Sequence, residues 1–278
     1  MSFFGLFADD EDEEKNVESK ESITPDFSHF EAITSYIYER SGITDLDSRA
    51  MIANQLRQLA LEHDIYNTDT FLQRMKSSDE FYQEIINLVT VNETYFFREL
   101  KELEWLVDYI KSLSTHFKIL SMPCSSGEEV YSILILLSEA GVDINRVEIT
   151  GYDINSDAVS KAQKAIFKER SLHKIPLHVR EKYFTKIDDE SYKLREIFKN
   201  RVSFYQKNIF ELENVYSKFD VVLSRNMFIY FDSEKRAKAV DIIASLLKTG
   251  GIYIKGHADS IKEHPNLKNI SYGVYKKI

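Results

Sequence analysis

The sequence predicts an α/β chain in which an all-α segment precedes a sheet of buried strands. Over residues 25–100, apolar side chains recur every three to four positions, which is the period of a helix that packs one face. No glycine occurs between Gly42 and Gly127, so nothing there favours a break in a helix. From Lys118 onward, short apolar runs alternate with amphipathic segments, as in a parallel sheet covered on both faces.

Four helices are expected over residues 25–98, a helical N-terminal domain, and a fifth over Glu99–Leu113. The first two helices are marked by apolar residues that share one face: Phe27, Phe30, Ile33 and Ile37, then Ile52, Leu56 and Leu59. Polar residues that can start the second, third and fourth helices are Asp45 or Asp47, Asp69 or Thr70, and Ser78.

Residues 99–278 are expected to form the α/β domain. Its strands are predicted at five apolar runs: Lys118–Met122, Val147–Tyr152, Val202–Tyr205, Phe219–Leu223 and Ile252–Lys255. Its further helices are predicted at Val130–Ala140, Asp157–Ala165 and Lys235–Leu247. Residues 166–201 interrupt this alternation with a polar stretch dotted with aromatic residues, which indicates an insertion.

The formal net charge of −9 is unevenly distributed. Residues 9–21 carry −6 and residues 22–98 carry −6, whereas residues 99–278 carry +3. This acidic balance argues against binding to nucleic acid, which draws on clustered lysine and arginine. The single cysteine, Cys124, cannot form an internal disulfide, and the seven histidines show no zinc-ligand spacing, so no metal is expected.

Residues 1–24 are interpreted as a disordered acidic tail, because the six consecutive acids Asp9–Glu14 repel one another. Alternatively, Phe3, Phe4, Leu6 and Phe7 form a short motif that docks in a groove of an unspecified partner. The N-terminus lacks the basic region and cleavage site of a signal peptide. The longest strongly apolar stretch, Ile133–Leu137, is too short to cross a bilayer. A cytoplasmic protein without direct membrane insertion is therefore expected.

The first candidate site is a strand that runs through a loop of small residues into a helix, ILSMPCSSGEEVYS over residues 119–132. Small residues allow a ligand to approach the backbone closely, but one glycine is too few for a G-x-G-x-x-G pyrophosphate site. Glu128 and Glu129 lie where a phosphate would approach, which favours a hydroxyl-rich or cationic ligand. Acids in a first helical turn also simply offset the helix dipole.

The second candidate site is TGYDIN, residues 150–155, where Asp153 ends a predicted strand. In βαβ nucleotide-binding units, an acid at the tip of the second strand accepts hydrogen bonds from ribose hydroxyls. Asp153 could instead cap the helix that follows, although Asn155 or Ser156 could take that role.

Two more segments combine aromatic and polar side chains. Residues 92–98, NETYFFR, join the two domains, and Arg98 offers a planar fork for a carboxylate, although such aromatic clusters more often pack helices together. Residues 220–232, DVVLSRNMFIYFD, place Arg225, Asn226 and Tyr230 beyond the carboxyl end of a strand, where ligands of open α/β sheets bind.

Together these segments resemble the CheR family, the S-adenosylmethionine-dependent methyltransferases of chemotaxis receptors. The resemblance covers almost the whole chain after the tail and includes KYF over residues 182–184, VSFYQKNI and LLKTGGIYIKGH. It implies a Rossmann-like methyltransferase sheet with a small antiparallel β-subdomain inserted at 166–201. It also implies S-adenosylmethionine as cofactor, S-adenosylhomocysteine as product, and glutamate side chains of the chemoreceptor cytoplasmic helical bundle as substrate.

Residue by residue, the resemblance implies that the cofactor contacts Asn92, Thr94, Arg98, Glu129, Asp153, Asn208, Ile209, Arg225 and Asn226. Arg98 and Tyr230 are implied as the catalytic pair that orients the incoming carboxylate or the methyl donor. Glu128 precedes the matched acid and is expected only to cap or orient.

The sequence departs from the family pattern in places that concern partners. The helical domain is net −6, whereas a basic face is thought to bind the receptor in other members. Some members also bind a receptor's C-terminal peptide on the β-subdomain. After the late glycine-histidine, Ala258-Asp259 stands where serine-glutamate is usual. Two alternatives stay open: a methyltransferase that acts on another protein or a small molecule, and a cofactor-binding adaptor without turnover.

Overall fold

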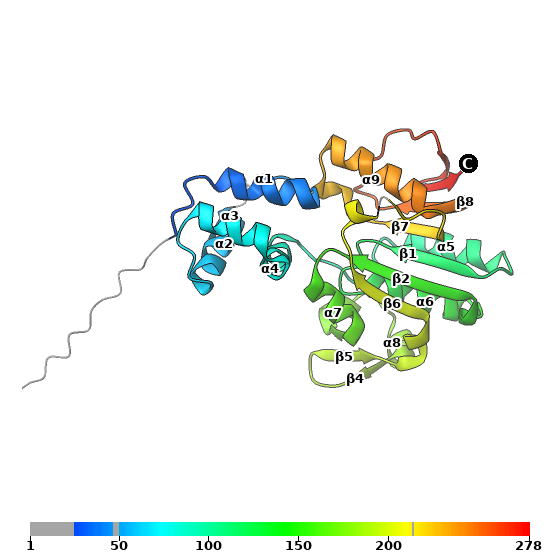
Figure 1. Cartoon of the computed structure of the whole chain (residues 1–278). Coiled ribbons are helices and arrows are strands. Elements are labelled where there is room, and N and C mark those ends of the chain that lie inside the picture. The colour runs from blue at the N-terminus through cyan, green and yellow to red at the C-terminus, as the bar shows by residue number, and fades with distance from the viewer. Residues whose placement is uncertain (1–24, 47–49, 213) are drawn as a thin grey trace, which may run out of the picture.

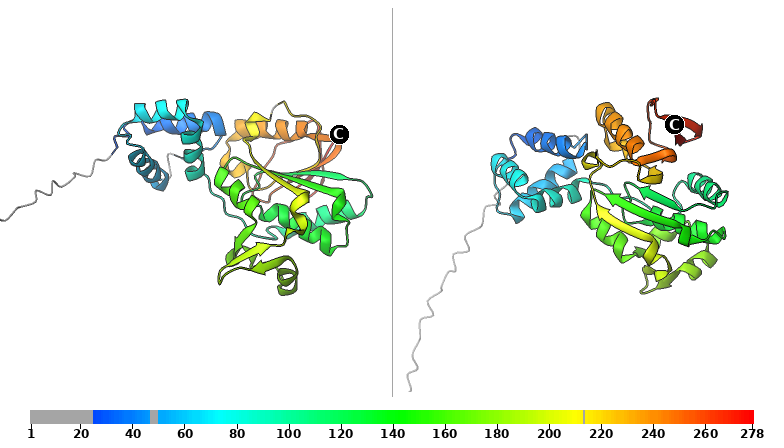
Figure 2. Two further views of the ribbon diagram at one scale, coloured as in Figure 1. Left: turned by 60° about the horizontal axis from the view of Figure 1, so that its bottom comes forward. Right: turned by 45° about the vertical axis from the view of Figure 1, so that its right-hand side comes forward.

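The computed structural model describes residues 25–46, 50–212 and 214–278. The expectations for the tail, and for Asp47 as a helix cap, lie outside these residues. In Figure 1 a group of helices lies beside an α/β part, and both views in Figure 2 keep it beside one end of the sheet.

Four helices make up the helical part: α1 (Phe30–Ser41), α2 (Ala50–Glu62), α3 (Thr68–Ser77) and α4 (Asp79–Val89). They enclose a core of their own to which the predicted stripe residues Ile33, Ile37 and Leu56 contribute fully buried side chains. The fifth helix, α5 (Leu100–Lys111), packs instead against the α/β part through α6.

The helix caps were predicted in part. Ser78 caps α4 as expected, because its side chain accepts a hydrogen bond from the N–H of Phe81 at 3.2 Å. The prediction for α3 was wrong: Asn67 is the cap, and α3 starts at Thr68, before Asp69 and Thr70. Asp45 has a φ of 60°, unlike the extended backbone of a typical N-cap.

The α/β part is built on a sheet of seven strands in the order β6-β2-β1-β7-β8-β10-β9. The strands are β1 (Phe117–Ser121), β2 (Val147–Asp153), β6 (Val202–Gln206), β7 (Phe219–Ser224), β8 (Leu247–Lys255), β9 (Leu267–Ser271) and β10 (Val274–Lys277). The first five in spatial order run parallel, as predicted. Strands β9 and β10 were not predicted, and they make the edge antiparallel, so a purely parallel sheet was wrong.

Alternate residues of strand β1 face opposite layers of the fold, as the pleat of a strand requires. Ile119 belongs to the apolar cluster formed with α5 and α6 (Glu128–Glu139), whereas Leu120 belongs to the cluster under α9 (Ser233–Leu246). Helix α7 (Ser156–Lys164) packs beside β2 and β6. The last helix ends at Leu246, and β8 begins at once with Leu247, five residues earlier than predicted.

The predicted insertion forms a second, antiparallel sheet in the order β3-β5-β4, as the family resemblance implied. It consists of β3 (Ile166–Lys168), β4 (Phe184–Lys186) and β5 (Ser191–Leu194), with α8 (Leu177–Tyr183) between β3 and β4. Phe167 and Phe184 of this sheet both pack edge-on against Phe96 from the segment that joins the helical part to α5.

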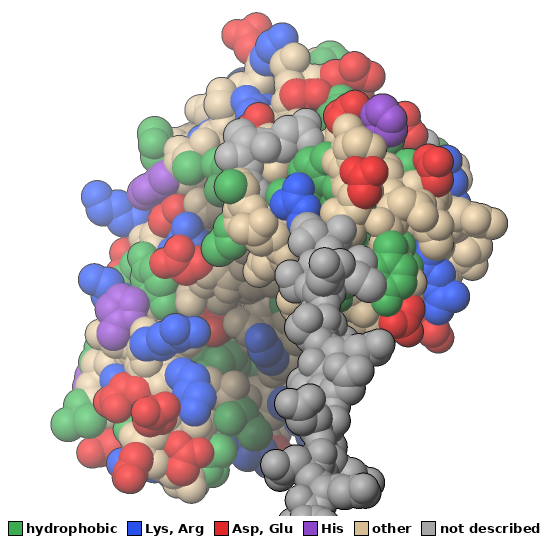
Figure 3. All heavy atoms as spheres, turned by 90° about the vertical axis from the view of Figure 1, so that its left-hand side faces the viewer, with side chains coloured by type: hydrophobic (Ala, Val, Ile, Leu, Met, Phe, Trp, Pro, Cys, Tyr) green, Lys and Arg blue, Asp and Glu red, His purple; other side chains and the backbone are tan. Residues whose placement is uncertain are grey.

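The face that Figure 3 presents carries intermingled basic and acidic side chains, and it is hollowed between its upper and lower parts. Among the described residues, no helix combines the length and apolarity that crossing a bilayer would need.

Because Gly151 has no side chain, strand β2 can pack closely against Phe204 and Cys124. Substituting this glycine therefore tests the packing of the sheet. A Cβ at this position would lie 2.5 Å from the Phe204 ring and 3.0 Å from Cys124 Cβ. Gly151→Ala should therefore lower the free energy of unfolding by about 1–3 kcal/mol through overpacking, measured by denaturant titration. Phe204→Leu in the same chain should recover part of the loss; an alanine variant as stable as the parent would contradict this packing.

Candidate active site

A cavity lies where the helical part meets the carboxyl ends of β1, β2 and β7. The structure brings all ten residues singled out in the sequence to its wall: Asn92, Thr94, Arg98, Glu129, Asp153, Asn208, Ile209, Arg225, Asn226 and Tyr230. They come from segments up to 138 positions apart, so the fold has assembled them. The contacts that each of these residues makes indicate what it can offer to a ligand.

Asp153, the last residue of β2, is a buried acid at the floor of the cavity. Its two carboxylate oxygens accept hydrogen bonds from the N–H groups of Ser125 at 2.7 Å and Asn155 at 2.9 Å. Burial raises the pKa of Asp153 to about 6, and these N–H groups only partly offset the effect. Asn155 rather than Asp153 caps α7, because its side chain accepts from the N–H of Ala158 at 2.8 Å.

The loop before α6 forms the neighbouring wall. Its Cys124 N–H donates to the carbonyl of Tyr152 at 2.8 Å, which holds the loop against β2. Gly127 has a φ of 93°, and a Cβ there would come within 3.0 Å of Ala162 Cβ on α7. A glycine is therefore needed both for the backbone turn and for the close approach of α7.

The paired glutamates at the start of α6 have different environments. Glu129 lines the cavity, accepts a hydrogen bond from Ser121 Oγ at 2.8 Å, and pairs with Arg225 at 2.6 Å. Glu128 accepts from Ser126 Oγ at 2.7 Å, and burial raises the pKa of its carboxyl. Glu128 is outside the cavity lining, which agrees with the expectation that it only orients the loop.

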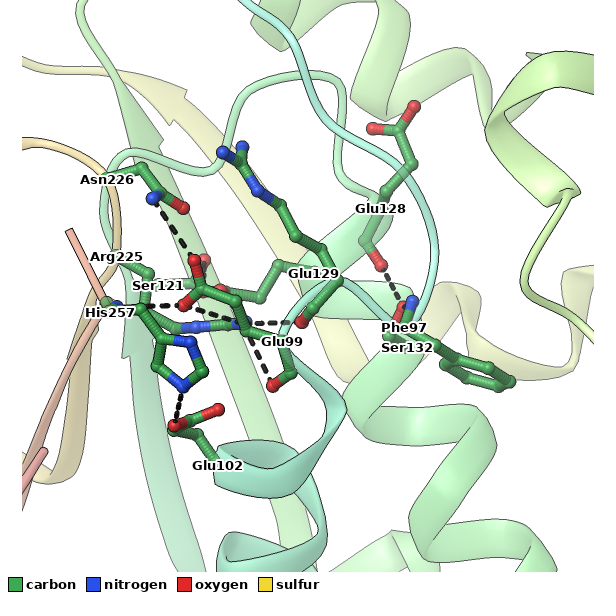
Figure 4. A network of polar contacts seen from close by, with 12 residues as sticks. Phe97, Glu99, Glu102, Ser121, Glu128, Glu129, Ser132, Arg225, Asn226 and His257 are labelled. Carbon is green, nitrogen blue, oxygen red and sulfur yellow. Dashed lines mark hydrogen bonds and ion pairs between the residues drawn. The ribbon is translucent and has the colours of Figure 1, made fainter. Parts of the chain in front are cut away.

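Arg225 lies at the centre of the polar network in Figure 4. One terminal nitrogen of its guanidinium pairs with Glu129. The other donates to the main-chain carbonyls of Arg98 and Glu99. This second nitrogen also pairs with the Glu99 carboxylate at 3.4 Å. Only 3% of the Arg225 side chain is exposed, against 13% for Glu129 and 15% for Glu99. Its remaining nitrogen, Nε, is buried without a partner in the described part of the chain.

Glu99 and Asp259 belong to this network and were missed as site residues. Burial alone would raise the pKa of Glu99. The N–H of His257 and the guanidinium of Arg225 outweigh this effect, so the pKa of Glu99 is lowered. Asp259 accepts hydrogen bonds from the N–H groups of Asn226 at 2.7 Å and Phe228 at 2.9 Å, which fixes the turn after β7. The only signal for Asp259 was that it occupies a position where the family pattern has another acid.

Arg98 and Tyr230 line the cavity, and each donates a hydrogen bond to a main-chain carbonyl. Arg98 donates to the Glu93 carbonyl at 2.8 Å, and its side chain is half-buried. The hydroxyl of Tyr230 donates to the Val91 carbonyl at 3.3 Å. Asn92 contributes its own carbonyl, which accepts from Ser125 Oγ at 3.2 Å. The Arg98 guanidinium and the Tyr230 hydroxyl are thus donors on the cavity wall that a ligand acceptor could engage.

Asn208 and Ile209 lie on the same wall as a polar and an apolar residue. Asn208 donates to the Arg40 carbonyl of α1 at 2.6 Å and accepts from the Phe210 N–H at 3.1 Å. Ile209 is buried and joins Met122, Ile154 and Met227 as apolar lining. The Asn208 amide thus donates across to the helical part, while its oxygen accepts from the turn that follows Asn208.

The donor set of the cavity fits an adenosine-type ligand that also carries positive charge. Asp153 and Glu129 offer acceptors for hydroxyl or ammonium groups, and the apolar lining suits a flat ring. The buried Arg225 Nε and the half-buried Arg98 offer donors for a carboxylate. The negative charges of Asp153 and Glu129 would repel a phosphate group.

One cluster of potential metal ligands occurs in the described ranges, formed by Glu99, Glu102 and His257. The Glu99 carboxylate already accepts from Asn226 Nδ2 at 3.3 Å and from the His257 N–H at 3.0 Å, and it pairs with Arg225. With these donors around Glu99, the cluster acts as an internal hydrogen-bond network.

Comparison with known proteins adds an independent finding. The family model "CheR methyltransferase, SAM binding domain" matches residues 92–275. A chemotaxis protein methyltransferase of Campylobacter jejuni is 34% identical over 92% of this chain and 98% of its own length. Chemotaxis protein methyltransferase 2 of Vibrio cholerae is 35% identical over 87% of this chain and 90% of its own length.

The buried charges around Arg225 predict an asymmetry between two substitutions. Arg225→Met leaves Glu99 and Glu129 without their cation, so the free energy of unfolding should fall by about 3–5 kcal/mol. Glu129→Gln keeps the hydrogen bond with Ser121 and should cost clearly less. Denaturant titration of both variants measures the difference; an equal loss in the two would contradict the central place given to Arg225.

Proposed function

The chain belongs to the CheR methyltransferase family and is an S-adenosylmethionine-dependent methyltransferase, and on this premise we propose that it methylates glutamate side chains on the cytoplasmic helices of chemoreceptors. The product on the receptor is a glutamate methyl ester, which serves adaptation in chemotaxis. The observation that carries the proposal is the convergence of all ten implied residues on one cavity within the matched region.

The cofactor supplies an electrophilic methyl group on a sulfonium centre. We assign its ribose hydroxyls to Asp153 and its positive charges to Glu129, because these two carboxylates of the cavity wall are sheltered from solvent, whereas Glu93 is exposed. Ile209 and Asn208 would flank the adenine, and Arg225, Asn226, Asn92 and Thr94 would complete the contacts. The donors and acceptors described above support this assignment.

The chain's own task in the reaction is placement. A glutamate side chain has an ordinary pKa of about 4.3, so it is ionised at neutral pH and needs no general base. Arg98 and Tyr230 would hold this carboxylate in line with the methyl group at about 3–3.5 Å, the distance of a near-attack geometry. Because the reaction joins an anion to a cation, walls that exclude water strengthen their attraction.

The receptor is expected to approach across the helical part and the mouth of the cavity. The helical part has an acidic balance, and basic and acidic side chains intermingle on the face in Figure 3, so docking would rely on paired charges rather than on one basic patch.

The sheet β3-β5-β4 is the place where a receptor's C-terminal peptide would bind. The partner of residues 1–24 is left unassigned, and the proposed site of action is the cytoplasm.

The proposed reaction can be tested with methyl-labelled cofactor and receptor-containing membranes. We expect label on the receptor that base releases as methanol, and Arg98→Ala should lower turnover by about a hundredfold. Arg201→Ala, at the opposite end of β6, is the matched control and should keep normal turnover.

Three outcomes would count against this proposal in whole or in part. Near-normal turnover by Arg98→Ala would remove Arg98 from catalysis. Saturable cofactor binding without transfer to receptors would favour an adaptor, and base-stable label on another molecule would favour a different methyltransferase substrate.

Asp153 predicts that cofactor affinity depends on pH. A carboxylate accepts hydrogen bonds from hydroxyls better than a protonated acid does, and the pKa of Asp153 is raised to about 6. Protonation as the pH falls from 7 to 5 should therefore weaken binding by about tenfold. Calorimetry with S-adenosylhomocysteine measures this, since the product's own groups keep their charge in that range. Asp153→Asn should bind weakly at both pH values; unchanged parent affinity at pH 5 would contradict the assignment.

A further inference from the structure

The main-chain carbonyl of Tyr230 is held by a residue from the helical part of the chain. Thr44 donates two hydrogen bonds to it, one from its N–H at 3.0 Å and one from Oγ1 at 3.0 Å. Thr44 lies between α1 and α2, far outside the residues 92–275 that match the family model, and it is not part of the cavity lining.

The other end of Tyr230 also contacts the helical part. Its hydroxyl donates to the carbonyl of Val91, directly after α4, at 3.3 Å. The backbone and the phenol of this residue therefore bond to two different segments that precede residue 92. The short helix that carries it, Phe228–Tyr230, is fixed on the α/β side by Asp259.

The loop that contains Thr44 has little freedom to move away. Gly42 has a φ of 75°, and a Cβ there would lie 2.6 Å from the Phe210 ring and 3.3 Å from the Phe231 ring. The nearby Tyr38 hydroxyl donates to Asp232 at 2.6 Å. Thr44 thus approaches Tyr230 from a loop that is itself packed tightly against the α/β part.

We propose that Thr44 is a positioning residue for Tyr230, so that the helical part completes the catalytic site in addition to any role in docking. This inference rests on the proposed catalytic role of Tyr230. Two donors on one carbonyl fix the place of the Tyr230 main chain, and a small displacement of an orienting group lowers the fraction of productive geometries. Cofactor affinity should stay unchanged, because Thr44 does not line the cavity.

The test compares three threonine variants in the receptor methylation assay. Thr44→Val removes the Oγ1 donor at nearly constant shape and should lower kcat about fivefold, the effect of one lost hydrogen bond. Thr44→Ser keeps the hydroxyl and should restore most of kcat. Thr68→Val removes a hydroxyl that donates to the Asp26 carbonyl and should leave kcat and KM unchanged. The cofactor dissociation constant and the thermal midpoint are measured for each variant.

A double-mutant cycle separates positioning from a general structural effect. Thr44→Val should cost about fivefold in the parent but nothing further in Tyr230→Phe, if Thr44 acts through the phenol. Equal losses in both backgrounds, an effect on the receptor KM alone, or no loss in Thr44→Val would overturn the inference while leaving the proposed function intact. Normal turnover by Tyr230→Phe would instead refute the catalytic role of Tyr230, and the inference with it.

Discussion

The site depends on one buried cation, the guanidinium of Arg225. It follows β7, pairs with Glu129 at the start of α6, and donates to two carbonyls at the start of α5. A single side chain thus sets the relative place of the strand end, the cofactor-side helix and the segment that carries Arg98. Removing a charge of this kind from water is costly, and only the full set of partners offsets the cost. Arg225 therefore ties several elements of the cavity wall together where the cofactor is expected to contact it.

The parallel strands and most helices could be predicted from the sequence, because buried strands and amphipathic helices leave distinct periods. The antiparallel edge could not: β9 (LKNIS) alternates weakly and β10 is short, so neither stands out from a polar loop. The cap of α3 was misplaced because Asn67, Asp69 and Thr70 are all good cap residues, so the residue types alone do not distinguish them.

The ten residues that line the cavity were singled out with the help of a family resemblance, and the family model confirms that family, whereas Glu99, Asp259 and Thr44 were not singled out. These three act on main-chain groups or on other side chains rather than lining the cavity. No residue pattern in one sequence indicates that an acid accepts from a loop 33 positions away. The residues that position a site are thus harder to predict than those that form its surface.

The way in which both parts of the chain form the cavity is consistent with the methyl transfer proposed for it. A methyl transfer to an ionised carboxylate needs no proton transfer, so the rate depends on alignment and on the exclusion of water. Alignment requires that the walls of the cavity keep their places, and those walls come from both parts of the chain: Ile43 and Val89 from one, Asp153 and Met227 from the other. Hydrogen bonds such as that from Asn208 to the Arg40 carbonyl join the two parts, which the alignment needed for the proposed chemistry requires. A partner that binds the helical part would act on the same geometry, because Ser41, Ile43 and Val89 of that part belong to the cavity wall.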